Sequence, residues 1–74
     1  MADAASLESR VTTAAVEHLS HQKTVDLVGV PEYDIVDMSG YEHLIWRGKT
    51  EDVELVVNTG TGSRHVIVSD RGEK

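Results

Sequence analysis

Apolar and polar residues alternate along three segments in the second half of the chain, and this alternation predicts three β-strands. The segments are Tyr41–Arg47, Asp52–Asn58 and Arg64–Asp70. The breaks between them, Gly48–Glu51 and Gly60–Ser63, contain the glycine, serine and threonine residues typical of turns. A phosphate-binding loop would open a helix, whereas each of these breaks precedes a strand. We therefore expect an antiparallel meander with hairpin turns.

The first part of the chain has the spacing of a helix. From about Ala5 to Gln22, apolar residues recur at intervals of three and four, and Ser6 is a suitable N-cap. The capping box is incomplete, because Ser9 stands where glutamate or glutamine would complete it. The apolar stripe consists of Leu7, Val11, Ala14, Ala15 and Leu19.

The segment Lys23–Val30 fits two structures. Gly29 followed by Pro31 is typical of the end of a longer helix. Thr24 and Val25, however, are β-branched and favour an extended conformation. We predict an extended segment.

A further strand is expected over Tyr33–Met38, with Ser39–Gly40 as a tight turn into the meander. The competing interpretation is a short helix that begins at Pro31. Together these elements predict an α+β fold: an N-terminal helix packed on one face of a small antiparallel β-meander of three to five strands. We expect a single domain over residues 1–74, with the helix at about 5–22, a β-rich part at about 24–70 and short tails at both ends.

The strand register can be predicted from the pattern, because a slip of one residue sends every side chain to the other face. Pairing Arg47 with Asp52, and Thr59 with Arg64, gathers the apolar residues on one face that no charged residue interrupts. We expect the helix to cover this face. Its residues are Leu44, Trp46, Val53, Leu55, Val57, Val66 and Val68.

The opposite face is mixed, with an apolar centre of Ile45, Val56 and Ile67. A sheet that is covered on one side only should be mostly polar on its other side. An apolar centre with a polar rim is instead the anatomy of a protein interface. The predicted interaction surface consists of Tyr41, His43, Ile45, Val56, His65 and Ile67.

Composition favours self-association. A chain of 74 residues buries only about 60% of the surface that it exposes when unfolded, so its stability margin is small. Disulfides cannot compensate, because the chain has no cysteine. A formal net charge of −6 argues against binding to a nucleic-acid backbone, which needs clustered lysine and arginine.

Four histidines raise the question of a metal site or of acid–base catalysis. His18 and His21 are three residues apart and could share one side of a helix, but the His-Glu-x-x-His signature is absent, so a third ligand would have to come from elsewhere in the fold. His43 and His65 lie on strands that the central strand separates, roughly 10 Å apart. We therefore predict no metal ligands, no cofactor and no catalytic residues.

These observations predict a small non-catalytic module that forms a homodimer, or binds another protein, through the outer sheet face. Two alternatives stay open: a small histidine-based metal-binding protein or enzyme, and an acidic inhibitor of a basic nucleic-acid-binding partner. We expect a cytoplasmic protein without a membrane partner, because no stretch approaches the ~20 apolar residues of a membrane span and the N-terminus lacks signal-peptide features.

Overall fold

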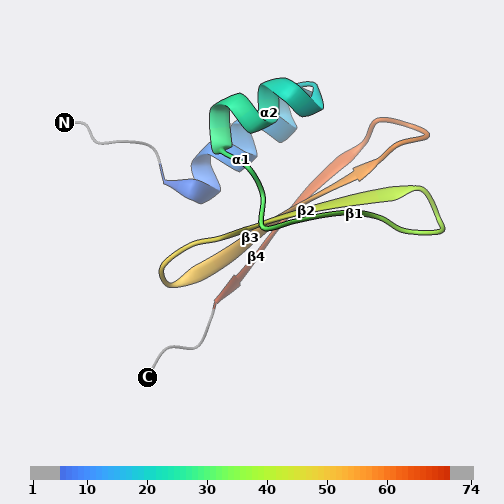
Figure 1. Ribbon diagram of the computed structural model, residues 1–74. Coiled ribbons are helices and arrows are strands. Elements are labelled where there is room, and N and C mark those ends of the chain that lie inside the picture. The colour runs from blue at the N-terminus through green and yellow to red at the C-terminus, as the bar shows by residue number, and fades with distance from the viewer. Residues whose placement is uncertain (1–5, 71–74) are drawn as a thin grey trace.

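The protein folds as two short helices on one face of a four-stranded antiparallel sheet (Figure 1). The computed structural model describes residues 6–70. The helices are α1 (Leu7–Val16) and α2 (His21–Val28), and the strands are β1 (Tyr33–Val36), β2 (Tyr41–Arg47), β3 (Glu51–Asn58) and β4 (Arg64–Asp70). The strands are neighbours in chain order. The predicted α+β fold is therefore confirmed.

Helix α1 begins as predicted but ends early. The Ser6 side chain accepts a hydrogen bond from the Ser9 N–H at 3.1 Å, which confirms the N-cap, while Ala5 lies outside the described residues. The prediction of one helix to Gln22 is wrong, because the chain leaves the helix at His18, whose φ is 51°. The N–H of Leu19 then bonds back to a carbonyl of the last turn, the arrangement of a Schellman motif.

The prediction of an extended segment over Lys23–Val30 is also wrong, because α2 occupies most of it. Ser20 restarts the helix by accepting a hydrogen bond from the Lys23 N–H at 3.2 Å. Helical geometry then buries Thr24 and Val28 against the rest of the protein. This burial outweighs the weak β-preference of the segment, because propensity is readily overridden by tertiary packing.

Neither helix in the described part of the chain has the length and apolar character needed to cross a lipid bilayer. The predicted strand over Tyr33–Met38 forms as β1, which ends at Val36, and residues 37–40 make the turn into β2.

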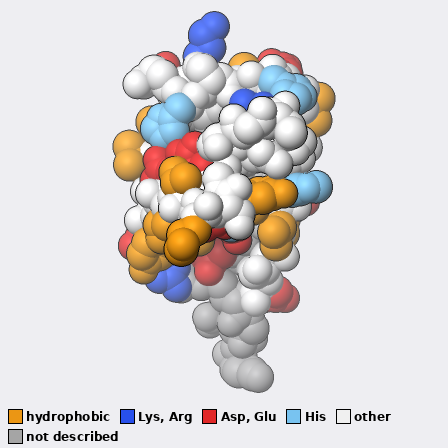
Figure 2. Space-filling model, turned by 90° about the vertical axis from the view of Figure 1, so that its right-hand side faces the viewer, with side chains coloured by type: hydrophobic (Ala, Val, Ile, Leu, Met, Phe, Trp, Pro, Cys, Tyr) orange, Lys and Arg blue, Asp and Glu red, His pale blue; other side chains and the backbone are white. Residues whose placement is uncertain are grey.

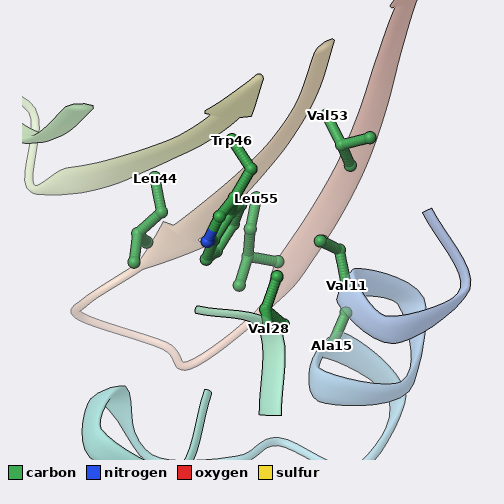
Figure 3. Close-up of a cluster of buried hydrophobic side chains, with 7 residues drawn as sticks. All are labelled: Val11, Ala15, Val28, Leu44, Trp46, Val53 and Leu55. Carbon is green, nitrogen blue, oxygen red and sulfur yellow. The ribbon is translucent and has the colours of Figure 1, made fainter. Parts of the chain in front are cut away.

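The core lies between the helices and the inner face of the sheet, as predicted. Trp46 is opposite Val53 in the predicted β2–β3 register, and both are buried. Figure 3 shows Val11 and Ala15 of α1 pointing toward the strand residues. Val57 and Val66 pack against this core from its margin, whereas Val68 is more exposed. The core cluster consists of Val11, Ala15, Val28, Leu44, Trp46, Val53 and Leu55.

The predicted β3–β4 register is wrong by two residues. Arg64 lies opposite Val57, whereas the prediction placed it opposite Thr59. The connection is longer than a tight turn because the Asn58 side chain accepts a hydrogen bond from the Gly60 N–H at 2.9 Å and stabilises a wider loop. A shift of two residues preserves the side-chain parity of a strand, so each residue still lies on its predicted face.

One hydrogen bond ties α2 to the sheet. The Trp46 indole Nε1 donates to the Gly29 carbonyl oxygen at 2.8 Å, directly after the end of α2. Gly29 has φ 109° and ψ 171°, a conformation that is essentially restricted to glycine. The direction of the chain after α2, and with it the position of the Trp46 partner, therefore depends on this glycine.

We expect Gly29→Ala to lower the free energy of unfolding by about 1–3 kcal/mol. A Cβ atom at this position would meet nothing within 4 Å, so the cost arises from the backbone conformation and not from a clash. Urea denaturation followed by Trp46 fluorescence measures both stability and the indole environment. An unchanged midpoint would contradict a structural role for the backbone at residue 29.

Candidate functional site

The helices lie on one face of the sheet (Figure 1), and we call the opposite face the outer face. The strand register places the six residues of the predicted interaction surface on this outer face. The register places Ile45, Glu54 and Ile67 in one row across the strands. The next row is His43, Val56 and His65, and Tyr41 pairs with Asn58 beyond it. Val56 is only 8% exposed, whereas Ile67 is 46% exposed. The expected apolar centre is thus interrupted, because Glu54 lies between Ile45 and Ile67, and Ile67 forms an exposed apolar edge at β4.

Strand β1 adds two residues that the sequence analysis did not include in this surface. Tyr33 pairs with Ile45, and Ile35 pairs with His43, so both lie on the outer face. Tyr33 is 49% exposed and Ile35 is 54% exposed. Their alternation with Asp34 was the available sequence signal. With them, each of the four strands contributes an apolar side chain to the outer face.

His43 links two acidic residues at this surface. Its Nδ1 lies 2.6 Å from Glu54 Oε2, and its Nε2 lies 3.0 Å from Asp37 Oδ2. The Asp37 carboxylate, and then Glu54, raise the pKa of His43 above its ordinary value. The hydrogen bond with His43, and then the Tyr41 N–H, lower the pKa of Asp37. A single histidine that readily carries a positive charge therefore lies between the two carboxylates.

The remaining histidines occupy separate environments. The prediction that His43 and His65 are not direct neighbours is confirmed, because Val56 lies between them in the row. His18 and His21 do not share a helix face. His18 lies in the link between the helices with its Nδ1 2.8 Å from Arg64 Nη1, whereas His21 begins α2.

A second polar cluster, which the sequence analysis missed, lies at the edge of the helix-covered face. His21 Nε2 is 2.8 Å from Asp34 Oδ2 and 3.8 Å from Glu42 Oε2. One potential ligand atom from each of the three residues lies within 4.8 Å of the other two. The sequence signal was the position of Glu42 two residues before Leu44, which places it on the inner face.

The cluster is electrostatically coupled. Its hydrogen bond with Asp34 raises the pKa of His21. The neighbouring Asp34 carboxylate, and then burial, raise the pKa of Glu42. A hydrogen bond with Glu42, and then the contact with His21, lower the pKa of Asp34. The two carboxylates therefore compete for one proton, as paired acids do.

A small pocket of about 50 Å³ adjoins this cluster, between the start of α2 and strands β2–β4. That volume is enough for a few water molecules. Figure 2 shows one side of the molecule, where a histidine side chain lies next to acidic side chains and hydrophobic side chains are distributed around them. The lining is mixed: four residues are polar or charged and four are apolar, namely His21, Thr24, Glu42 and Arg64 with Leu19, Leu44, Leu55 and Val57.

Comparisons of the chain with family models, curated proteins and solved structures found no significant match.

The stability contribution of the His43–Asp37 pair should be largest at mildly acidic pH. The pKa of His43 is raised above 6.5, so its contribution is complete below that value and is lost as the pH rises through the folded pKa. The pKa of Asp37 is lowered below 3.8, so its contribution is complete above that value and is lost as the pH falls through the folded pKa. We expect the difference in urea midpoint between wild type and His43→Gln to peak between these two pH values.

An NMR titration of the histidine imidazoles checks the cause. The pKa of His43 should lie above 6.5 in the wild type and fall toward 6.5 in Asp37→Asn, which retains a side-chain oxygen but loses the charge. A wild-type value at or below 6.5 would contradict the proposed pairing.

Proposed function

We propose that the protein is a non-catalytic interaction module that forms a homodimer through the outer face of its sheet. The observation that carries this proposal is the set of apolar side chains that all four strands place on a face that neither helix covers. The uncovered face of a monomeric sheet is ordinarily polar. In this sheet, Tyr33, Ile35 and Ile67 are each about half exposed.

The charge of the outer face supports a second copy as the partner. Three acidic residues lie at this face: Arg47 pairs with Asp52, and His43 pairs with both Glu54 and Asp37. The whole chain, in contrast, carries a formal charge of −6. Two copies that meet through this face therefore bring together acidic residues that already have a basic partner within their own chain. A basic partner would instead favour a strongly acidic face.

Self-association would also enlarge a small core. Among the described residues, the largest fully buried side chains are Leu44, Leu55, Val11 and Val53, all of them aliphatic. A domain of this size leaves a large part of its apolar surface exposed. Contact between two outer faces would bury Ile35 and Ile67 in addition, and each buried side chain of this kind contributes about 1.5–3 kcal/mol relative to full exposure.

The size of the outer face sets the expected strength of the dimer. The strands β1 to β4 have 4, 7, 8 and 7 residues. At ~3.4 Å per residue and ~4.8 Å between strands, they cover roughly 420 Å². Contact through this face on both copies buries about 850 Å² in total, less than the ~1,200–2,000 Å² of stable complexes. The proposal is therefore a reversible dimer with a micromolar dissociation constant.

Ile67→Asp should dissociate this dimer. The substitution places a carboxylate in the apolar contact, and two-fold symmetry introduces it twice. We expect the dissociation constant to rise at least about tenfold, which corresponds to about 1.4 kcal/mol. Sedimentation equilibrium from micromolar to millimolar protein should show the wild-type mass rising from 8.1 kDa toward twice that value, and the variant remaining near 8.1 kDa.

Val16→Asp is the matched control. Val16 is 72% exposed on α1, in the helical layer, and its replacement adds the same charge away from the outer face. The control should associate like the wild type, and circular dichroism should show that both variants retain the fold. A wild-type protein that stays at 8.1 kDa over the whole range would refute the homodimer, and equal masses for the two variants would refute the proposed face.

A further inference from the structure

We propose that His21, Asp34 and Glu42 form a binding site for a divalent transition-metal ion such as Zn²⁺. Three elements converge on this point, because His21 begins α2, Asp34 lies in β1 and Glu42 lies in β2. The site is on the helix-covered side of the sheet, so it goes beyond the proposed dimer and rests on different residues.

The spacing of the ligand atoms fits one ion. A tetrahedral zinc ion with ligands at about 2.0–2.1 Å separates those ligands by roughly 3.3 Å. His21 Nε2 is 2.8 Å from Asp34 Oδ2 and 3.8 Å from Glu42 Oε2, on either side of this value. The side chain of His21 is 53% exposed and that of Asp34 is 35% exposed, so both have room for the small rotations that remain.

The ligand types select the class of metal. Calcium and magnesium prefer shells made of oxygen atoms, six or more in number. One imidazole with two carboxylates suits zinc and its transition-metal neighbours instead. The chain has no cysteine to offer a competing thiolate site.

The local charge calls for a cation. Within residues 6–70, the ion pairs of Asp34 and Glu42 are with His21. A divalent ion would replace the protons that these groups share, because it binds the two carboxylates as anions and the imidazole in its neutral form, and its charge would balance theirs. The Glu42 side chain is only 20% exposed, so solvent screens the charge of this carboxylate incompletely.

The adjoining pocket provides a place for a fourth ligand. His21 and Glu42 both line it, so a water molecule inside could reach an ion that these residues hold. Thr24 also lines the pocket and is 3% exposed. Within residues 6–70, its hydroxyl makes a long contact of 3.5 Å with the Leu19 carbonyl oxygen, which leaves it able to bond such a water.

The cluster around His43 lacks this geometry, although it has the same composition. His43 contacts Glu54 through Nδ1 and Asp37 through Nε2. The two ring nitrogens point in different directions, so one ion cannot be coordinated by His43 and by both carboxylates. The His43 cluster can therefore be compared with the His21 cluster in the same chain, since both consist of a histidine with two acidic neighbours.

Isothermal titration of the full chain with Zn²⁺ tests the proposal. The wild type should bind one ion per chain with micromolar affinity. Glu42→Gln and Asp34→Asn should each weaken binding at least tenfold, because even changes outside the ligand shell commonly cost about 10–100-fold. Asp37→Asn, which alters the His43 cluster, should bind like the wild type.

NMR of the four imidazoles identifies the ligand directly. Zinc should shift the His21 resonances at one equivalent and leave those of His18, His43 and His65 unchanged. Binding only at millimolar zinc, equal binding by Glu42→Gln and the wild type, or a shift at another histidine would overturn the proposal. Ile67→Asp should still bind one zinc ion, so failure of the dimer and failure of the metal site are distinguishable.

Discussion

The packing of two short helices on the inner face of the sheet is the constraint on which the rest of the structure depends. Helices α1 and α2 have 10 and 8 residues, and isolated helices below about 12–15 residues are marginal in water. They persist because Val11 and Val28 are buried against Leu55 and the other inner-face residues (Figure 3). The sheet needs the same contact, because its inner face would otherwise be exposed. Helices and sheet therefore stabilise one another.

This packing also positions the cluster proposed to bind a metal ion. The Trp46–Gly29 hydrogen bond holds the end of α2 at β2, and the break after α1 allows α2 to start again in a new direction. As a result, His21 at the start of α2 lies beside Asp34 of β1. If one helix continued to Gln22, His21 would lie in the last turn of that helix and would follow the direction of α1. The residues that end one helix and begin the next thus contribute to the site without being ligands.

Much of the sheet could be predicted because alternation determines which face a side chain occupies. That information survives an even shift in register, which is why Arg64 is two residues from its predicted partner while every face assignment holds. The register itself depended on the loop after Asn58, whose side-chain hydrogen bonds are not encoded in the alternation. The fold class was therefore predictable and the loop geometry was not.

The helical region was harder for a physical reason. Ser20 resembles other serines in sequence, and it acts as an N-cap only because His18 adopts a left-handed conformation two residues earlier. The β-preference of Thr24 and Val25 is small compared with the burial that α2 gains. The cluster of His21, Asp34 and Glu42 could not be predicted for the same reason, because it forms only when α2 is in place.

The distribution of charge separates the two proposed surfaces. Acidic residues that could oppose self-association are paired on the outer face, where His43 bridges Asp37 and Glu54. At the edge of the inner face, Asp34 and Glu42 converge with His21 alone among the described residues as their ion-pair partner. A surface with exposed apolar side chains favours contact with another protein, whereas two carboxylates and an imidazole that converge on one point beside a pocket favour a cation. Opposite sides of one small sheet can thus serve two kinds of binding, because alternating side chains let each side be built from its own set of residues.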